Sequence, residues 1–571
     1  MPSTDPVIAE LTGPGGAFEI VVADVCGIPT QVFEQRMRSM RELVAQNALR
    51  GEVDWLVQGD RRLTYAEHDA AVRSVAARLA GLGVQHGDRV ALAAANCPEW
   101  VITFWASAVL GAVLVPLNAW WKAEELEFGI IDSGAKVFVG DERRVELMRP
   151  RLTEMRELRH VFSIGAAGDH PVRSFDELLG DDTAALPDAP IDEDDLLAIA
   201  YTSGTTGEPK GATITQRQAI ANLQNIIFAG FAQALRGTPP PEASAGLQSA
   251  SLLIVPLFHV TGCLATMVVA YATGGRLVLM PPGRFDPDRA MEVIEREKVT
   301  AIGGVPTIMW RIVESPGLGK YDLSSVKRAS YGGAPAAPEL VQRIEEVFPN
   351  LRKTLTTAYG LTESASVATL NSGDDYFSHP GSVGRAVPTV EIRVVDEDGD
   401  DAPAGEPGEI WVKGPTIMAR GYWRRPEDDA AALTDGWFHS GDIGYLDADG
   451  FLYIVDRAKD MIIRAGENIY CVEVEHVLFD HRDVIDAAVV GVPHKELGEE
   501  VKAVVQLRAG ATTSPEEVRG FCREHLADFK VPAYVEIRDE PLPRNPAGKI
   551  LKNLLRSGAT SVTESSDDSV L

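Results

Sequence analysis

Residues 201–212 read Tyr201-Thr-Ser-Gly-Thr-Thr-Gly-Glu-Pro-Lys-Gly-Ala212. The apolar run Leu196–Ala200 precedes this stretch and predicts a buried strand. The stretch itself has almost no apolar surface, but its glycines let a ligand come close and its backbone N–H groups can converge on an anion. Lys210 adds a positive charge. We therefore expect a polyphosphate-binding loop formed by Thr202, Ser203, Gly204, Thr205, Thr206, Gly207 and Lys210.

Two other interpretations of this loop were weighed. A flexible surface linker has a similar composition, but a linker needs neither a buried strand before it nor a Pro-Lys pair at its end. The Walker phosphate loop requires Gly-Lys followed by Ser or Thr. No such triplet follows Gly207, so the loop is of another kind.

Composition restricts the classes of partner. The 571 residues exceed one ordinary domain, and 45% hydrophobic residues suit a globular protein with several cores. The 83 acidic and 54 basic residues give a formal charge of −29. A field of this sign repels nucleic acids and anionic membranes, so neither is expected as the main partner.

Several features favour a reduced, cytoplasmic location. The five cysteines are scattered without a Cys-x-x-Cys pair, which argues against disulfides and structural zinc. The N-terminus lacks the pattern of a secretory signal. The apolar runs Val101–Val115 and Leu252–Thr273 are expected in the core rather than in a membrane, since the first is too short and Pro256 and His259 interrupt the second.

Alternating apolar segments predict an α/β fold with parallel sheets covered by helices. Helices are expected at 32–49, 64–80, 98–110, 124–133, 215–227, 264–273 and 287–298, and strands at 88–94, 112–116, 136–139, 196–200, 252–255, 276–280, 300–303 and 326–330. Residues 165–195 are expected to be a connector. The restart of the pattern after the glycine-rich loop indicates a second sheet.

The pattern changes near residue 381. Short strands at 390–396, 408–414, 436–440 and 451–455 predict a small β-barrel, and helices at 473–481 and 514–525 with strands at 484–490 and 502–507 predict a small α+β domain. We expect a large N-terminal domain at 1–457 with subdomains of about 1–190, 191–380 and 381–457, a mobile C-terminal domain at 458–557, and a disordered tail at 558–571.

The order Thr-Ser-Gly-Thr-Thr-Gly-x-Pro-Lys-Gly resembles the signature loop of the adenylate-forming (ANL) superfamily. This superfamily contains acyl-CoA synthetases, adenylation domains of peptide synthetases, and luciferases. Further motifs follow in the family's order and extend the resemblance over about residues 60–555. The resemblance implies activation of a carboxylic acid by ATP and Mg²⁺.

Two motifs are implied to hold the nucleotide in the large domain. Tyr331-Gly-Gly-Ala-Pro335 follows a predicted strand, and the family binds adenine at the positions of Gly332, Gly333 and Ala334. Alone, this segment is more typical of an ordinary strand-to-helix turn. In Ala358-Tyr-Gly-Leu-Thr-Glu363, the ring of Tyr359 can stack on a purine beside Gly360, Thr362 can donate to the α-phosphate, and Glu363 is a hard oxygen ligand for Mg²⁺. Thr357 stands where many members have Asn or Gln.

Three further residues are implied at the end of the large domain. A carboxylate can accept both ribose hydroxyls, and the family uses the position of Asp442 for this contact. A turn aspartate is the common alternative. Arg457 resembles a second nucleotide contact, and Lys459 falls at the hinge about which the small domain turns.

The acid pocket and the remaining sites follow from the same resemblance. The pocket is implied to contain His259, Gly262, Cys263, Gly303 and Gly332, with His259 as an aromatic gate rather than a proton carrier, although a lone buried histidine is more often a core residue. Gly466, in a segment where Ala465 replaces a family glycine, is implied to line the pantetheine tunnel. Lys549, in Leu542-Pro-Arg-Asn-Pro-Ala-Gly-Lys549, is implied to lie between the carboxylate and the α-phosphate, where a cation lowers the repulsion of two anions.

The sequence therefore predicts a ligase of the fatty-acid–CoA branch, with Lys549, Thr362, Glu363 and Lys210 in catalysis and ATP, Mg²⁺ and coenzyme A as co-substrates. A medium- or long-chain fatty acid is the expected substrate, ahead of aryl or steroid-derived acids. Alternatives are transfer to a carrier protein, a luciferase-like oxygenase and a non-catalytic nucleotide-binding regulator. A homodimer and weak membrane association through a lipid substrate are further expectations.

Overall fold

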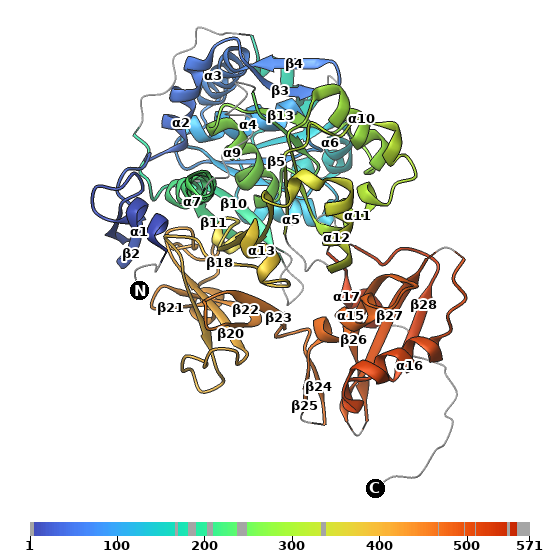
Figure 1. The fold of residues 1–571 in the computed structure, drawn as a ribbon. Coiled ribbons are helices and arrows are strands. Elements are labelled where there is room, and N and C mark those ends of the chain that lie inside the picture. The colour runs from blue at the N-terminus through green and yellow to red at the C-terminus, as the bar shows by residue number, and fades with distance from the viewer. Residues whose placement is uncertain are drawn as a thin grey trace. The chain divides into compact units, whose positions relative to one another are not determined.

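The computed structural model describes residues 5–165, 170–180, 190–202, 209–236, 248–332, 338–465, 467–495, 497–508, 510–544 and 549–556 (Figure 1). The chain divides into two compact units. The first unit contains Met1–Arg393, Trp411–Ser440 and Gly450–Leu452, and the second contains Val394–Ile410, Gly441–Asp449 and Tyr453–Leu571.

One sheet of the first unit has seven strands in the order β11-β10-β6-β5-β7-β8-β9. All neighbours are parallel except β10 and β11, which are antiparallel. The strands are β5 (Arg89–Ala93), β6 (Val113–Pro116), β7 (Val137–Asp141), β8 (His160–Ile164), β9 (Val172–Ser174), β10 (Leu196–Thr202) and β11 (Lys210–Thr215). Their buried apolar residues fit strands covered on both faces.

A second sheet has nine strands in the order β18-β17-β16-β15-β14-β12-β13-β3-β4. The strands from β16 to β3 are parallel, and antiparallel strands close both edges. Their bounds are β3 (Asp54–Gln58), β4 (Arg61–Thr64), β12 (Ala250–Leu253), β13 (Arg276–Leu279), β14 (Ala301–Gly304), β15 (Arg328–Gly332), β16 (Leu355–Tyr359), β17 (Thr369–Ser372) and β18 (Arg385–Ala386).

Several helices of the first unit begin and end at residue types that are typical of helix ends. Thr64 and Glu67 form a capping box at the start of α3, with Thr64 Oγ1 accepting from Glu67 N at 3.1 Å. Pro98 opens α4, and Gly111 ends it in the left-handed conformation at φ +75°. The helices are α1 (Pro6–Thr12), α2 (Met40–Asn47), α3 (Tyr65–Gly81), α4 (Pro98–Leu110), α5 (Ala123–Ser133), α6 (Glu142–Met148), α7 (Gln216–Leu235), α9 (Val268–Ala272), α10 (Pro287–Glu297), α11 (Pro306–Val313), α12 (Pro338–Val347), α13 (Asp374–Ser378) and α14 (Pro426–Ala432).

Short helical turns complete the first unit. Most are 3₁₀ turns, at η1 (Ala48–Arg50), η2 (Arg149–Glu154), η3 (Phe175–Leu178), η5 (Leu318–Lys320), η6 (Pro349–Leu351) and η7 (Thr362–Ser364). The exception is η4 (Thr261–Met267), which is a π-helix that continues directly into α9. Such turns are rare and occur frequently at functional sites.

Helix α4 is buried almost completely, with Trp100, Phe104 and Trp105 at most 1% exposed. These residues belong to one large cluster that also contains parts of α3, β10 and α9. A helix that is hydrophobic on all sides must lie inside the protein, and this explains why the apolar run at Val101–Val115 is core.

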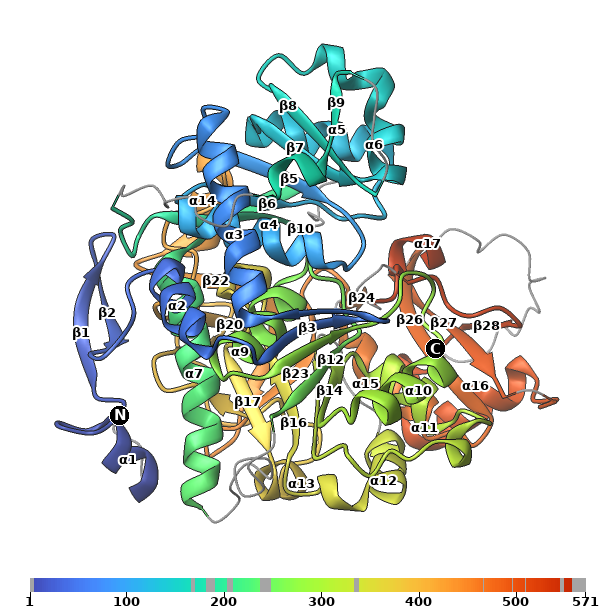
Figure 2. The same ribbon diagram turned by 90° about the horizontal axis from the view of Figure 1, so that it is seen from above.

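The N-terminal residues form a hairpin rather than one long helix. Strands β1 (Ile20–Val25) and β2 (Ile28–Phe33) pair antiparallel, and Figure 2 shows them alongside α7. The surface helix expected at 32–49 is therefore wrong at its start: only α2 is helical, and its Met40, Leu43 and Val44 side chains are buried.

The chain from residue 391 forms two further five-stranded sheets. The first has the order β19-β20-β22-β21 with β23 paired to β22, and its strands are β19 (Glu391–Val395), β20 (Gly408–Lys413), β21 (Leu433–Thr434), β22 (Trp437–Leu446) and β23 (Leu452–Arg457). The second has the order β25-β24-β27-β26 with β28 paired to β27. It comprises β24 (Ile462–Arg464), β25 (Glu467–Ile469), β26 (Val484–His494), β27 (Gly498–Leu507) and β28 (Tyr534–Arg538) and accompanies helices α15 (Cys471–Phe479), α16 (Pro515–His525), η8 (Asp528–Lys530) and α17 (Lys552–Arg556).

The predicted fold class is confirmed, with three corrections in detail. The sheets are mixed rather than purely parallel. Residues 165–195 are not only a connector, because β9 and η3 bury Val172, Phe175 and Leu178. Strands β10 and β11 join the first sheet, whereas β3 and β4 join the second. The domain and subdomain boundaries themselves stay predictions.

All five cysteines are free thiols, as the sequence predicts. None of the helices in the described residues combines the length and apolar composition that a membrane span requires.

His68 is an unusual buried group in α3. Its ring is fully buried at centroid distances of 5.9 Å from Trp55 and 5.5 Å from Tyr271. Neither ring nitrogen has a hydrogen-bond partner within the described part of the chain. Burial lowers the pKa of His68 to about 3, so the folded protein holds this ring neutral.

We predict that His68 makes the protein sensitive to mild acid. Its folded pKa lies below the unfolded value of about 6.5, so the unfolded chain binds a proton first as the pH falls, and stability is lost from about pH 6.5 downward. The loss reaches about 2 kcal/mol at pH 5. Scanning calorimetry of His68→Leu should show a smaller decrease in melting temperature between pH 7.5 and pH 5 than the wild type shows.

The matched control is His525→Leu, which removes an exposed histidine of α16. It should leave the pH dependence unchanged. An equal pH dependence in His68→Leu and the wild type would contradict the account of His68.

Candidate active site

The glycine-rich segment connects two paired strands. Thr202, the last residue of β10, lies opposite Lys210, the first residue of β11, and Thr202 Oγ1 donates to the Lys210 carbonyl at 3.4 Å. Ser203, Gly204, Thr205, Thr206 and Gly207 lie outside the described residues. The strand β11 was not predicted, and its pairing brings the two ends of the segment together.

Lys210 and Glu363 are connected through one tyrosine. The Tyr422 hydroxyl donates to Glu363 Oε1 at 2.9 Å, and the Lys210 ammonium lies 5.5 Å from the centroid of the Tyr422 ring. Lys210 also forms an ion pair with Asp428 of α14. Burial, followed by the charge of Glu363, raises the pKa of Tyr422, so the hydroxyl stays protonated as a donor.

Neither Tyr422 nor Asp428 was predicted from the sequence as a residue of the site. The available signal was local: the aromatic pair Tyr422-Trp423 follows Gly421 and precedes the acidic run Glu427-Asp428-Asp429. The contact of Tyr422 with Glu363 spans 59 residues of sequence and could not be read from spacing.

The segment from Tyr359 to Glu363 forms a tight turn at the end of β16. Thr362 and Glu363 lie in η7 with half-buried side chains, and Ala365 and Ser366 adopt φ +52° and +113°. A Cβ atom at Gly360 would lie 1.6 Å from the Ser366 carbonyl oxygen, so this position requires glycine.

The carboxyl ends of β14, β15 and β16 meet at one edge of the nine-stranded sheet. Gly332 pairs with Ala358, directly before Tyr359, and Gly303 pairs with Ser330 on the other side of β15. A Cβ atom at Gly332 would lie 2.7 Å from the Ala358 carbonyl oxygen. Gly333 and Ala334 lie outside the described residues. The carboxyl ends of parallel strands are the usual ligand side of such sheets.

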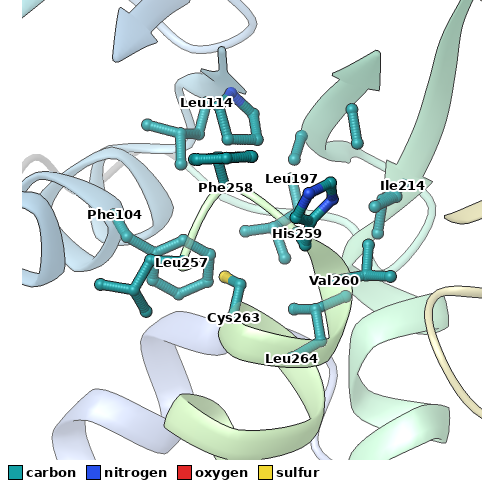
Figure 3. A pocket seen from close by; sticks show the side chains of 13 residues that line it. Phe104, Leu114, Leu197, Ile214, Leu257, Phe258, His259, Val260, Cys263 and Leu264 are labelled. Atoms are coloured by element: carbon teal, nitrogen blue, oxygen red, sulfur yellow. The ribbon is translucent and has the colours of Figure 1, made fainter. Parts of the chain in front are cut away.

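A small apolar cavity lies beside the predicted gate residue (Figure 3). His259 and Cys263 are among its lining side chains, which also include Phe104, Leu114, Leu197, Ile214, Leu257, Phe258, Val260 and Leu264. The open volume is about 20 Å³, close to that of a single water molecule. Burial raises the pKa of the Cys263 thiol, so Cys263 serves as a wall residue and not as a thiolate nucleophile.

Aromatic rings cover one side of this cavity. Phe258 lies 4.6 Å from the His259 ring and 5.1 Å from the Trp120 ring, measured between centroids. Gly262, Gly303 and Gly332 are not among the lining residues. A Cβ atom at Gly262 would lie 2.3 Å from the Pro256 carbonyl oxygen, so close packing of the backbone explains this glycine.

The second unit brings the predicted ribose and nucleotide contacts together. Arg457 Nε lies 3.0 Å from Asp442 Oδ1, and the Asp442 side chain is only 5% exposed. Lys459 is exposed, and its carbonyl accepts from Arg556 Nη2 at 3.4 Å. Next to Arg457, Asp456 accepts from Cys471 N, and burial raises the pKa of Asp456 to about 6.

Two further predicted residues belong to the second unit. Lys549 is exposed and directly precedes Ile550, which forms a bridge with Arg544. Gly466 lies outside the described residues, but its neighbour Ala465 adopts φ +53°. This is the conformation that glycine favours, which agrees with the family glycine that Ala465 replaces.

A magnesium ion fits this site only together with a phosphate ligand. No group of three or more His, Cys, Asp or Glu side chains that could hold a metal occurs in the described ranges. Glu363 offers one half-buried carboxylate, which accepts a hydrogen bond from the Tyr422 hydroxyl. One or two carboxylates combined with substrate phosphates are the usual magnesium site of nucleotide enzymes.

Comparison with known proteins identifies the family of the chain. The family model of the AMP-binding enzyme matches residues 43–423, and that of the AMP-binding enzyme C-terminal domain matches residues 473–549. The chain is 36% identical over 503 residues to a feruloyl-CoA synthase of Amycolatopsis sp, covering 87% of this chain and 94% of that protein. It is 34% identical over 527 residues to a long-chain-fatty-acid–CoA ligase of Bacillus subtilis (strain 168), covering 87% and 90%.

A solved structure, ATP-bound MatB from Rhodopseudomonas palustris, superposes with a TM-score of 0.79 at 30% identity, covering 91% of this chain and 98% of that chain. AMP-forming CoA ligases use ATP, Mg²⁺ and CoA as co-substrates. The family matches extend over most of the chain and agree with the fold and with the predicted motifs. The chain therefore belongs to the AMP-binding enzyme family, as an AMP-forming acyl-CoA synthetase of the adenylate-forming superfamily.

Proposed function

We propose that this enzyme joins a hydrophobic carboxylic acid to coenzyme A in two steps. A carboxylate oxygen of the acid attacks the α-phosphorus of ATP, and pyrophosphate leaves. The sulfur of CoA then attacks the acyl carbonyl, losing its proton, and AMP leaves. The observation that carries the proposal is the cluster of Lys210, Tyr422 and Glu363 in the unit that also contains the apolar cavity.

The first step is a problem of charge, because two anions must meet. We assign Lys549 and Thr362 to the carboxylate and α-phosphate, and Lys210 with Ser203–Gly207 to the departing β- and γ-phosphates. Glu363 would hold the magnesium ion, which neutralises phosphate charge when bound. No protein nucleophile is needed, since the acid itself attacks and the residues act by position and charge.

We assign the residues of the second unit to the nucleotide and to the change between steps. Asp442 and Arg457 form an ion pair at 3.0 Å, and this paired carboxylate is suited to accept ribose hydroxyls. Lys459 is the proposed hinge, about which the small domain turns after adenylation. That turn would withdraw Lys549 and bring Gly466 to the pantetheine arm of CoA.

The apolar cavity supports a hydrophobic acyl group, and we propose a medium- or long-chain fatty acid as the first candidate. An aryl acid is the second candidate, because the rings of Phe258 and His259 form an aromatic wall on which a planar ring could stack. Since the open volume is only about 20 Å³, either acid would have to displace side chains on binding.

Incubation with ATP, Mg²⁺, CoA and a panel of acids should yield AMP and one acyl-CoA series, identified by mass spectrometry. The panel should contain fatty acids of graded length, cinnamic and benzoic acids, and a steroid-derived acid. Lys549→Ala should decrease acyl-adenylate formation by about 100-fold or more, because the cation between the two anions is lost.

The control for this experiment is Lys320→Ala, which removes an exposed lysine of η5. Its activity should equal that of the wild type. Adenylate formation with transfer only to an added carrier protein would support the carrier-loading alternative. Absence of both AMP and adenylate with every acid would leave a non-catalytic nucleotide-binding regulator and overturn the ligase proposal.

A bulkier residue at position 263 should reduce the chain length of the acids that the enzyme accepts. Cys263 lines the apolar cavity, and Cys263→Leu adds volume to an already small space. We expect kcat/KM for long-chain acids to fall by about 10-fold, with little change for acids of up to four carbons. Cys263→Ala is the matched control and should retain long-chain activity. Equal losses for short and long acids would place the acyl group elsewhere.

Removal of Asp428 should tighten ATP binding. Lys210 is paired with Asp428 in this structure, and the side chains are 21% and 32% exposed, so the pair contributes at most about 1 kcal/mol. Titration calorimetry of Asp428→Asn with a non-hydrolysable ATP analogue should show a Kd lower by about 2- to 5-fold. Asp322→Asn, which breaks the exposed pair with Lys298, should not change this Kd. Weaker binding by Asp428→Asn would mean that Asp428 supports Lys210 rather than competing with the phosphate.

A further inference from the structure

The segment Met418–Asp429 runs between the two parts of the first unit that hold Lys210 and Glu363. On one side Trp423 N donates to the Gly211 carbonyl at 2.7 Å, next to Lys210 in β11. On the other side Met418 N donates to the Glu363 carbonyl at 2.9 Å. The segment is therefore fixed by backbone hydrogen bonds at both places.

Tyr422 lies in the middle of this segment and its backbone has little freedom. Tyr422 N donates to Asp429 Oδ1 at 2.6 Å, and Tyr422 forms an antiparallel bridge with Ala212. The preceding Gly421 adopts φ +67°, and a Cβ atom there would lie 2.3 Å from the Asp429 carboxyl group. Its carbonyl accepts from Thr213 Oγ1 at 2.6 Å. The buried tyrosine ring is thus held in one place.

This fixed ring touches both charged groups of the site. Its hydroxyl donates to Glu363 Oε1 at 2.9 Å, and its face lies 5.5 Å from the Lys210 ammonium. A carboxylate has several acceptor positions, so it can accept a hydrogen bond from a tyrosine and also hold a metal ion. A hydrogen bond from the protein to a metal-binding carboxylate fixes its orientation and tunes its affinity.

Orientation matters more here than in a site with many protein ligands. The described residues provide no cluster of three or more His, Cys, Asp or Glu ligands, so a magnesium ion would depend on one carboxylate and on phosphate oxygens. A free glutamate side chain samples several rotamers. Holding it in one rotamer when the ion binds costs conformational entropy. A donor that restricts the side chain beforehand reduces this cost.

We propose that Tyr422 is a positioning residue that orients the Glu363 carboxylate for the magnesium–ATP complex. The inference rests on the proposed function, because it takes Glu363 as the magnesium ligand. Tyr422 does not touch the reacting atoms. It acts through Glu363, and its ring also lies 5.5 Å from the ammonium of Lys210, the lysine proposed to bind the departing phosphates.

The test compares metal binding by the wild type and by Tyr422→Phe, which keeps the ring and removes the hydroxyl. Electron paramagnetic resonance measures the Kd of Mn²⁺ in the presence of a saturating non-hydrolysable ATP analogue, with Mn²⁺ standing in for Mg²⁺. The Kd should rise by about 10-fold or more in the variant. The Mg²⁺ concentration that gives half-maximal pyrophosphate release should rise equally, and kcat at saturating Mg²⁺ should recover to within about 3-fold.

Two controls separate positioning from general damage. Tyr65→Phe removes another buried hydroxyl, which donates to the Gly275 carbonyl at 2.8 Å, and should leave the Kd of Mn²⁺ unchanged. In a Glu363→Gln background, Tyr422→Phe should weaken Mn²⁺ binding by less than 2-fold, because the two residues act through one interaction.

Each outcome bears on the inference in a stated way. Unchanged Mn²⁺ affinity in Tyr422→Phe, with metal-dependent nucleotide binding intact in the wild type, overturns the role of Tyr422 and leaves the proposed function standing. If the wild-type protein binds no metal–nucleotide complex, both the role of Tyr422 and the proposed function are overturned. If Tyr422→Phe does not fold, Tyr422→His is measured instead. Its ring ends well short of the tyrosine hydroxyl position, so the same weaker binding is expected, and unchanged affinity again overturns the role.

Discussion

The antiparallel pairing of β10 and β11 is the constraint on which the site depends. It fixes Thr202 and Lys210 opposite each other at the two ends of the glycine-rich segment. The same strand β11 donates hydrogen bonds from Thr213 to the Gly421 carbonyl and accepts one from Trp423 N, and so fixes the segment that carries Tyr422. The positions of Lys210 and Glu363 relative to each other therefore follow from backbone pairing, which is more rigid than contacts between long side chains.

Local signals in the sequence predicted much of the fold. Helix α4 has the predicted bounds Pro98–Leu110, and Pro98 and Gly111 mark its two ends. The Thr64–Glu67 capping box and the apolar run before Thr202 were equally informative. The expected helix at 32–49 was wrong at its start, because Val32 and Phe33 belong to β2, whose partner β1 cannot be inferred from periodicity. Tertiary pairing decides such ambiguous segments.

The residues of the site could be predicted only where they belong to a recognisable sequence motif. Thr362 and Glu363 occur together in η7, and Asp442 and Arg457 prove to be an ion pair. Tyr422 and Asp428 have no motif of their own, and their contacts reach back 59 and 218 residues. Gly262 was predicted to line the acid pocket, but it is not among the residues that line the cavity, and the close Pro256 carbonyl accounts for that glycine.

The π-helical turn η4 gives the cavity wall an unusual property. A π-turn holds one residue more than the equivalent α-turn, and η4 continues directly into the regular helix α9. Deletion of one residue within Thr261–Met267 would let the turn become regular without moving α9. The residues on either side would then keep their helical phase, because the wide turn accommodates its extra residue locally, and only the side chains within the turn would change places. A single-codon deletion can thus exchange the groups that face the cavity, so substrate range can change here in one genetic step.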